Sequence, residues 1–143
     1  MRLYLAAAWS RKDEVRMIAD ALNELPEIEV QARWLFEPVP KDYNTTFREQ
    51  RAVMDVEDVV GADVLVRFTD DLSGPVVPAG LATGARMFEM GLAYALGKTI
   101  IVVGGIQPIF DYLPSVIHVK NVEELILTLL QRVAAFHIEV SRG

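Results

Sequence analysis

The chain has 143 residues, 52% hydrophobic and 24% charged, which predicts one compact domain over residues 1–143 and excludes a disordered chain. Its net charge of −6 disfavours binding to a nucleic-acid polymer but still allows a local site for one small anion. It has no cysteine, which excludes disulfides and thiolate chemistry and fits a cytoplasmic location, and no apolar run approaches the roughly eighteen residues of a membrane span.

The N-terminal part reads as strand, helix, strand. Residues 2–8 form a short apolar run that predicts a buried first strand, and the run at residues 3–9 is too short for a signal peptide. Ser10, three residues before Asp13, predicts a helix cap, and we expect this helix to stop at Pro26. Its apolar residues recur at helical spacing: Val15, Ile18, Ala19, Leu22 and Leu25. Residues 28–35 are rich in β-forming side chains and predict a second strand.

A second helix is predicted after a polar, proline-containing loop at residues 37–44. Thr46 and Glu49 have the spacing of a capping box, and the helix is expected to end before Gly61. One face of it is apolar: Ala52, Val53, Val56, Val59 and Val60.

The C-terminal part continues the alternation. Strands are predicted at residues 63–68, 99–103 and 116–119, and glycine- and proline-containing connections at residues 70–83 and 104–115. A helix at residues 87–96 is closed by Gly97, and Asn121 with Glu124 caps a last helix. That last helix is expected to pack through Leu125, Leu129 and Val133.

Strands that alternate with helices require right-handed crossovers and a parallel sheet that is covered on both faces. The sequence therefore predicts a five-stranded, doubly wound parallel α/β domain of the Rossmann or flavodoxin-like type. In such sheets ligands bind beyond the carboxyl ends of the strands. We therefore expect residues 6–12, 69–86 and 104–111 to surround one crevice.

Glu89 is the only carboxylate in a helix that is otherwise apolar on all sides. A buried glutamate must be paired, protonated or held for use, because burial disfavours its charge. Arg86, one turn earlier, is a candidate partner, and a simple helix ion pair is the structural alternative. The functional interpretation is favoured because this helix opens directly from the glycine-rich loop at the crevice.

Three further residues are candidates for the same site. Asp55 borders the apolar face of its helix, so its side chain is a candidate to enter the site. The alternative is that Asp55 is an exposed carboxylate within a run of acidic residues. Tyr4 and Trp9 lie on the first strand and at its exit, where aromatic residues are usually part of the core.

Together these residues resemble the nucleoside 2-deoxyribosyltransferase family and its relatives, the 2'-deoxynucleoside 5'-phosphate N-hydrolases. Tyr4 followed five positions later by Trp9 is similar to the family's first strand. Asp55, eight residues before Asp63, stands where the family keeps a catalytic aspartate, and Glu89 stands in the nucleophile position. The resemblance implies a dimer or higher homo-oligomer and no cofactor.

The sequence departs from the transferases at Thr83, where they have an aspartate and the hydrolases a small hydroxyl residue. The hydrolases also use a serine and an arginine for the 5'-phosphate, and Ser10 and Arg11, followed by Lys12, lie at a predicted helix start that favours an anion. A nucleoside 5'-monophosphate is therefore the favoured substrate, with a solvated helix start as the alternative. The further substrate-binding candidates are Gly84 and Arg86.

The resemblance implies cleavage or exchange of an N-glycosidic bond. Glu89 would attack the anomeric carbon, Tyr4 would fix its rotamer, and Asp55 would assist the departing base. Two alternatives remain: a non-catalytic nucleotide-binding module, and a phosphoribohydrolase of the cytokinin-releasing type, which the glycine-containing residues 78–84 weakly resemble. His118 and His137 are not a spaced ligand pair, so no metal site is expected.

Overall fold

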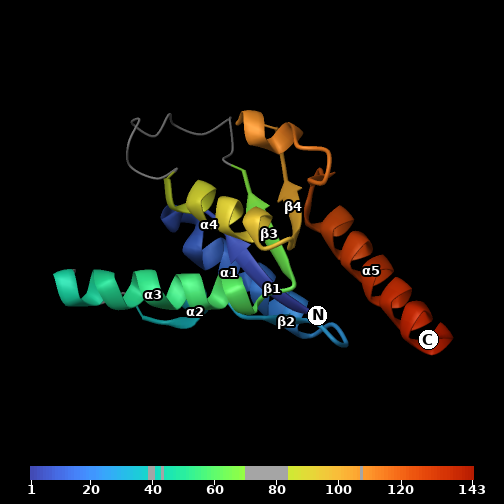
Figure 1. Cartoon of the computed structure of the whole chain (residues 1–143). Helices are drawn as coiled ribbons and strands as arrows, with labels where there is room; N and C mark the ends of the chain where they lie inside the picture. The colour runs from blue at the N-terminus through green and yellow to red at the C-terminus, as the bar shows by residue number, and fades with distance from the viewer. Residues whose placement is uncertain (39–40, 43, 70–83, 107) are drawn as a thin grey trace.

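Five parallel strands form one sheet in the order β2-β1-β3-β4-β5 (Figure 1). The computed structural model describes residues 1–38, 41–42, 44–69, 84–106 and 108–143. The strands are β1 (Arg2–Ala6), β2 (Glu29–Val30), β3 (Val64–Phe68), β4 (Thr99–Val103) and β5 (Ile117–Val119). This strand order is that of flavodoxin-like domains, so the predicted fold class is confirmed.

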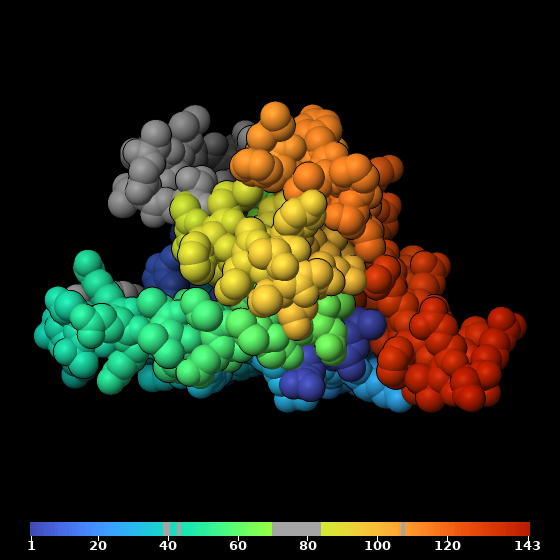
Figure 2. Space-filling view, viewed as in Figure 1, coloured from blue at the N-terminus to red at the C-terminus, as the bar shows by residue number. Residues whose placement is uncertain are grey.

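The helices that cover this sheet are α1 (Lys12–Asn23), α2 (Arg33–Phe36), α3 (Thr45–Gly61), α4 (Gly84–Ala95) and α5 (Val122–Arg142). Two 3-10 turns, η1 (Trp9–Arg11) and η2 (Ile109–Tyr112), follow β1 and β4. Helix α3 contacts β1 and α4, and α4 packs against β3 and β4. Figure 2 shows α4 between α3 and the η2 region on one face of the molecule. None of the helices in the described ranges is long and apolar enough to cross a membrane.

The central strands are buried because helices cover both faces of a parallel sheet. Every residue of β3 is buried, including Arg67, whose Nη2 lies 2.5 Å from the Asp111 carboxylate of η2. Leu5, Leu65 and Ile101 are fully or almost fully buried. Each such side chain contributes about 1.5–3 kcal/mol relative to an exposed one.

The strand predicted at residues 28–35 is wrong beyond Val30, because tertiary contacts favour a short helix there. The carboxylate of Asp58 accepts hydrogen bonds from the backbone N–H of Arg33 at 2.9 Å and from its Nε, which caps α2. The indole of Trp34 donates to the carbonyl oxygen of Leu5 at 2.9 Å. These bonds join α2 to α3 and β1, and residue-level β propensity does not reveal them.

Two predicted helix caps are also wrong. Ser10 lies in η1, and α1 begins after Arg11, which makes no side-chain capping bond. The next cap is Asn44 rather than Thr46, because the Asn44 side chain accepts a hydrogen bond from the N–H of Phe47 at 2.8 Å. Asparagine is among the residues preferred at this position, because its side-chain oxygen satisfies one of the first helical N–H groups.

The C-terminal predictions are closer to the structure. Strand β4 has the predicted bounds, and Gly97, with φ of 70°, follows α4 in the left-handed conformation expected of a helix stop. Asn121 caps α5 by accepting from the N–H of Glu124 at 2.9 Å. Helix α4 begins at Gly84, three residues earlier than predicted.

Candidate active site

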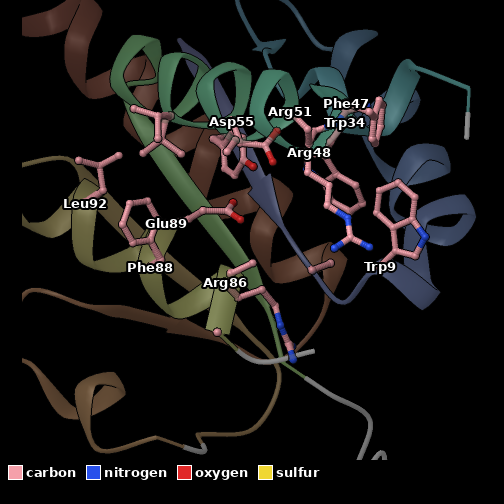
Figure 3. Close-up of a pocket in the computed structure, with 17 residues that line it drawn as sticks. Trp9, Trp34, Phe47, Arg48, Arg51, Asp55, Arg86, Phe88, Glu89 and Leu92 are labelled. Atoms are coloured by element: carbon pink, nitrogen blue, oxygen red, sulfur yellow. The ribbon is translucent and has the colours of Figure 1, made fainter. Parts of the chain in front are cut away.

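A pocket of about 940 Å³ opens between α3, α4 and the end of β1 (Figure 3). Among the described residues its lining is mostly apolar and aromatic, with two carboxyl groups and three arginines. The aromatic and aliphatic members include Tyr4, Trp9, Trp34, Phe47, Phe88 and Leu92, and the charged ones are Arg48, Arg51, Asp55, Arg86 and Glu89. A concave apolar surface with a few convergent polar groups is typical of a small-molecule site.

Glu89 enters this pocket from α4. The helix turns Met90 and Ala93 into the core, and Phe88 and Glu89 line the pocket. The Glu89 Oε2 atom is buried and accepts no hydrogen bond from any described residue. Burial raises the pKa of Glu89 to about 7, and the Tyr4 hydrogen bond opposes this rise. The Asp55 charge raises that pKa further, while the Arg86 charge lowers it.

Tyr4 is positioned by β1, in register with Leu65 of β3. Its side chain is almost fully buried, and its hydroxyl donates a hydrogen bond to Glu89. Burial, followed by the charges of Glu89 and Asp55, raises the pKa of Tyr4 well above its ordinary value. The hydroxyl therefore remains a protonated donor at neutral pH, and it stabilises the ionised form of Glu89.

Asp55 faces Glu89 from α3, and in Figure 3 the two carboxyl groups point into the same space. Burial raises the pKa of Asp55 to about 6, against the opposing charge of Arg51. The Oδ1 atom of Asp55 is buried and has no hydrogen-bond partner within the described ranges. Two partly buried carboxyl groups with pKa values near neutrality on opposite walls of one pocket are a common arrangement in acid–base and covalent catalysis.

Arg86 lines the pocket but runs away from the Glu89 carboxylate in Figure 3. Its Nη1 donates to the carbonyl oxygen of Phe68 at 3.4 Å. Its charge is the smallest of the influences on the pKa of Glu89. Arg86 therefore contacts the end of β3, and the arrangement does not favour a simple helix ion pair between Arg86 and Glu89.

The basic residues after β1 lie beside the pocket rather than in its lining. Arg11 donates to both carboxylate oxygens of Glu14 at 2.8 and 3.0 Å and to the carbonyl oxygen of Thr69 at 2.7 Å. Lys12 donates to the carbonyl oxygen of Glu37 and lies 4.8 Å from the ring centroid of Trp9. Ser10 is exposed and does not line the pocket, whereas Trp9 does.

Gly84, a predicted substrate-binding residue, lines the pocket. Thr83 lies outside the described residues, as do residues 78–83 of the segment that resembles the phosphoribohydrolases. Over the part of the chain that the structure describes, no three His, Asp or Glu side chains are arranged to hold a metal ion.

Sequence reasoning missed the aromatic and basic wall of α3. Phe47, Arg51 and Asp55 follow one another at intervals of four residues, so they share one helix face. That spacing could have revealed a functional face of the helix. The prediction for this helix instead followed its apolar residues. Trp34 was missed because its segment was predicted to be a strand.

No protein-family model matches the chain, and no curated protein sequence matches it significantly. Solved structures do match over most of its length. The CMP N-glycosidase BcmB of Clostridium botulinum is 17% identical, with a TM-score of 0.52 over 90% of this chain and 98% of that one. A conserved protein from Enterococcus faecalis V583 is also 17% identical, with a TM-score of 0.65 over 92% and 98%.

A third similar structure is the 2-deoxyribosyltransferase of Bacillus psychrosaccharolyticus. It is 16% identical, with a TM-score of 0.64 over 87% of this chain and 90% of that one. At this identity what is shared is the flavodoxin-like fold.

Proposed function

We propose that the protein cleaves or exchanges the N-glycosidic bond of a nucleoside or its 5'-monophosphate, through a glycosyl-enzyme intermediate on Glu89. One observation carries this proposal. The Glu89 carboxylate is held by Tyr4, and its second oxygen is buried in an aromatic-lined pocket without a partner among the described residues. A ligand that develops positive charge is the natural partner for such an oxygen.

The chemistry requires such a carboxylate. Departure of the base gives the anomeric carbon oxocarbenium character, and ionised Glu89 stabilises this charge and then bonds to the carbon. With a pKa of about 7, Glu89 is substantially ionised at neutral pH, and the developing positive charge favours ionisation further. The hydrogen bond from Tyr4 favours the ionised carboxylate and restrains its direction of attack.

Asp55 assists the departing base, either by donating a proton or by orienting it. Its pKa of about 6 is already raised by burial, and a bound base that displaces water from the pocket raises it further. Base departure needs a protonated Asp55 opposite an ionised Glu89. Without substrate the order is the reverse, because the pKa of Glu89, about 7, lies above that of Asp55, about 6. The proposal therefore requires the bound substrate to exchange the two protonation states: its developing positive charge lowers the pKa of Glu89, and the base raises that of Asp55.

The acceptor is either water or a second base, and both outcomes use the same intermediate. The two named enzymes of similar fold are an N-glycosidase and a 2-deoxyribosyltransferase. A non-catalytic nucleotide-binding module would gain nothing from the orphaned Glu89 oxygen facing a negatively charged ligand.

The test is an activity panel with free base as the readout. Purified protein is incubated with nucleosides and their 5'-monophosphates, with and without a second base, and products are followed by chromatography. Glu89→Gln serves as the inactive variant, and Glu139→Gln, at an exposed position of α5, as the matched control. Release of base or a mixed product by wild type and Glu139→Gln, but not by Glu89→Gln, supports the proposal, and no turnover of any substrate refutes it.

A further inference from the structure

Arg51 is a second group in the pocket whose hydrogen-bonding capacity is only partly used. It lies on α3, one turn before Asp55, and only 12% of its side chain is exposed. Its Nη2 donates to the Glu37 carboxylate at 2.8 Å, and its guanidinium lies 5.5 Å from the ring centroid of Phe47. Its Nε and Nη1 atoms are buried, and no described residue accepts a hydrogen bond from either.

A buried donor without an acceptor is costly, and an arginine cannot escape the cost by losing its proton. Glu37 balances the charge of Arg51 but engages only one of its three nitrogens. Both nitrogens are out of contact with solvent in this conformation, but Arg51 itself lines the open pocket, so a turn of its side chain toward the pocket would let a ligand supply the missing acceptors. The ligand group must then be an oxygen or nitrogen with a free lone pair.

The neighbours of Arg51 indicate which part of a nucleoside this is. Trp9 and Trp34, with ring centroids 6.0 Å apart, and Phe47 line the same pocket as Arg51 and offer apolar faces to a planar ring. The charge of Arg51 also acts on Asp55, the residue assigned to the departing base. Glu89, assigned to the sugar, enters from the opposite helix. Arg51 therefore belongs to the base end of the pocket.

We propose that Arg51 donates hydrogen bonds to a carbonyl oxygen of the leaving base, so that the site favours bases with a carbonyl group over adenine, which has none. This inference rests on the proposed function. When the C1'–N bond breaks, its electron pair moves onto the base and is delocalised onto the carbonyl oxygen. C1' bonds to a Glu89 oxygen, and a proton from Asp55 completes the free base. Arg51 stabilises the negative charge while it develops.

The experiment compares four bases on the same sugar: cytosine, uracil, hypoxanthine and adenine, each as nucleoside and 5'-monophosphate. Wild type is expected to show a higher kcat/KM for at least one carbonyl-bearing base than for adenine. Arg51→Ala should lower kcat/KM for that base about 10- to 100-fold, as expected for a lost charge-assisted hydrogen bond, and should change adenine little. Arg51→Lys keeps the charge but not the planar donors, so it should restore only part of the preference.

Arg16→Ala is the matched control, because Arg16 also lies over a phenylalanine ring, 5.7 Å from the centroid of Phe36, but outside the pocket lining. It should keep the wild-type base preference. A wild-type preference for adenine overturns the inference, and so does an equal loss for all four bases in Arg51→Ala. A loss confined to 5'-monophosphates overturns it as well, because it would assign Arg51 to the phosphate.

Binding of free bases separates this inference from the proposed function. Calorimetric titration of Glu89→Gln with hypoxanthine and with adenine needs no turnover. Tighter binding of hypoxanthine that is lost in the Glu89→Gln/Arg51→Lys double variant supports base recognition even if no substrate is cleaved. Equal binding of the two bases, together with equal turnover of their nucleosides, contradicts it.

Discussion

The hydroxyl of Tyr4 on β1 donates a hydrogen bond to the carboxylate of Glu89 on α4, so a strand of the core sets the position of the candidate nucleophile. Both residues are held by rigid elements. The hydrogen bond favours the ionised carboxylate, and burial favours the neutral one.

Tyr4→Phe removes this hydrogen bond and leaves the ring in the core. Because the bond lowers the pKa of Glu89, its loss should raise that pKa above about 7. If turnover requires ionised Glu89, the acid limb of the pH–kcat profile then moves to higher pH. The measurement is kcat against pH for wild type and Tyr4→Phe. An acid limb at the same pH in both proteins would contradict this role of Tyr4.

Glu89→Gln should abolish turnover and stabilise the fold at alkaline pH. The folded-state pKa of Glu89 is raised from 4.5 to about 7, so the folded state disfavours the charge. Wild type therefore loses stability from this group as pH rises from about 4.5 to 7, and the neutral amide does not. The gain in Tm of the variant over wild type should grow across this range and then level off.

The same melting curves test the structural alternative. If Glu89 were mainly an ion-pair partner of Arg86, Glu89→Gln would lower the Tm at neutral pH and leave the rate almost unchanged. A lower Tm with preserved turnover in the purified variant would exclude the proposed mechanism.

Asp55→Asn tests assistance to the leaving base. The amide cannot donate the acidic proton, so kcat should fall about 100-fold or more for ordinary nucleosides, as expected for a lost general acid. A 7-methylguanine nucleoside carries a cationic base that departs without protonation. For this substrate the decrease in kcat caused by Asp55→Asn should be much smaller. Single-turnover rates on the two substrates give the comparison. An equal loss on both would assign Asp55 to orientation alone.

The parts of the site that sequence reasoning reached are those that local patterns determine. Glu89 stood out because it interrupts an apolar helix, and Gly97 marked the end of that helix because a left-handed residue is needed there. The strand bounds of β4 followed from a continuous β-branched run. Each of these signals lies within one element.

The missed parts depend on contacts between distant segments. Trp34 lines the pocket because its indole reaches the Leu5 carbonyl and Asp58 caps its short helix. No local pattern contains these bonds. Likewise, the sequence gives no reason for a charged Arg67 within the apolar strand β3. The fold supplies the reason, because Asp111, 44 residues later, lies against Arg67 and compensates its charge.

A homo-oligomer is expected because large apolar side chains remain exposed on several elements, among them η2, α4 and α5. On η2, Ile109 is 76% exposed and Phe110 59%, and on α4 Tyr94 is 50% exposed. Arg67 joins the two elements by contacting Met87 of α4 and Asp111 of η2. Such a patch usually marks an interface.

The double variant Ile109→Glu/Phe110→Glu should therefore reduce the mass measured by light scattering at micromolar concentration to that of a monomer. Met17→Glu, at an exposed apolar position of α1, is the control and should keep the wild-type mass. A monomeric, fully active wild-type protein would disprove the expected assembly.

The last prediction concerns the 5'-phosphate and Arg11. The guanidinium of Arg11 is already engaged by Glu14 and the carbonyl oxygen of Thr69, so a phosphate that binds there must compete with the Glu14 carboxylate. Arg11→Ala should weaken binding of a monophosphate by about 1.5–3 kcal/mol and change the matching nucleoside little. Glu14→Gln should have the opposite effect, because it removes the competing charge.

Both effects should shrink with added salt, since Arg11 is only partly buried. Arg48 provides the comparison, because it lines the mouth of the pocket and its side chain is exposed. Inhibition constants for a monophosphate and its nucleoside are measured in wild type, Arg11→Ala, Glu14→Gln and Arg48→Ala. If the monophosphate preference disappears in Arg48→Ala and survives in Arg11→Ala, the phosphate lies against α3 and not beside the end of β1. If wild type prefers the nucleoside, a free nucleoside is the substrate, and Arg11 and Glu14 are an ordinary surface ion pair.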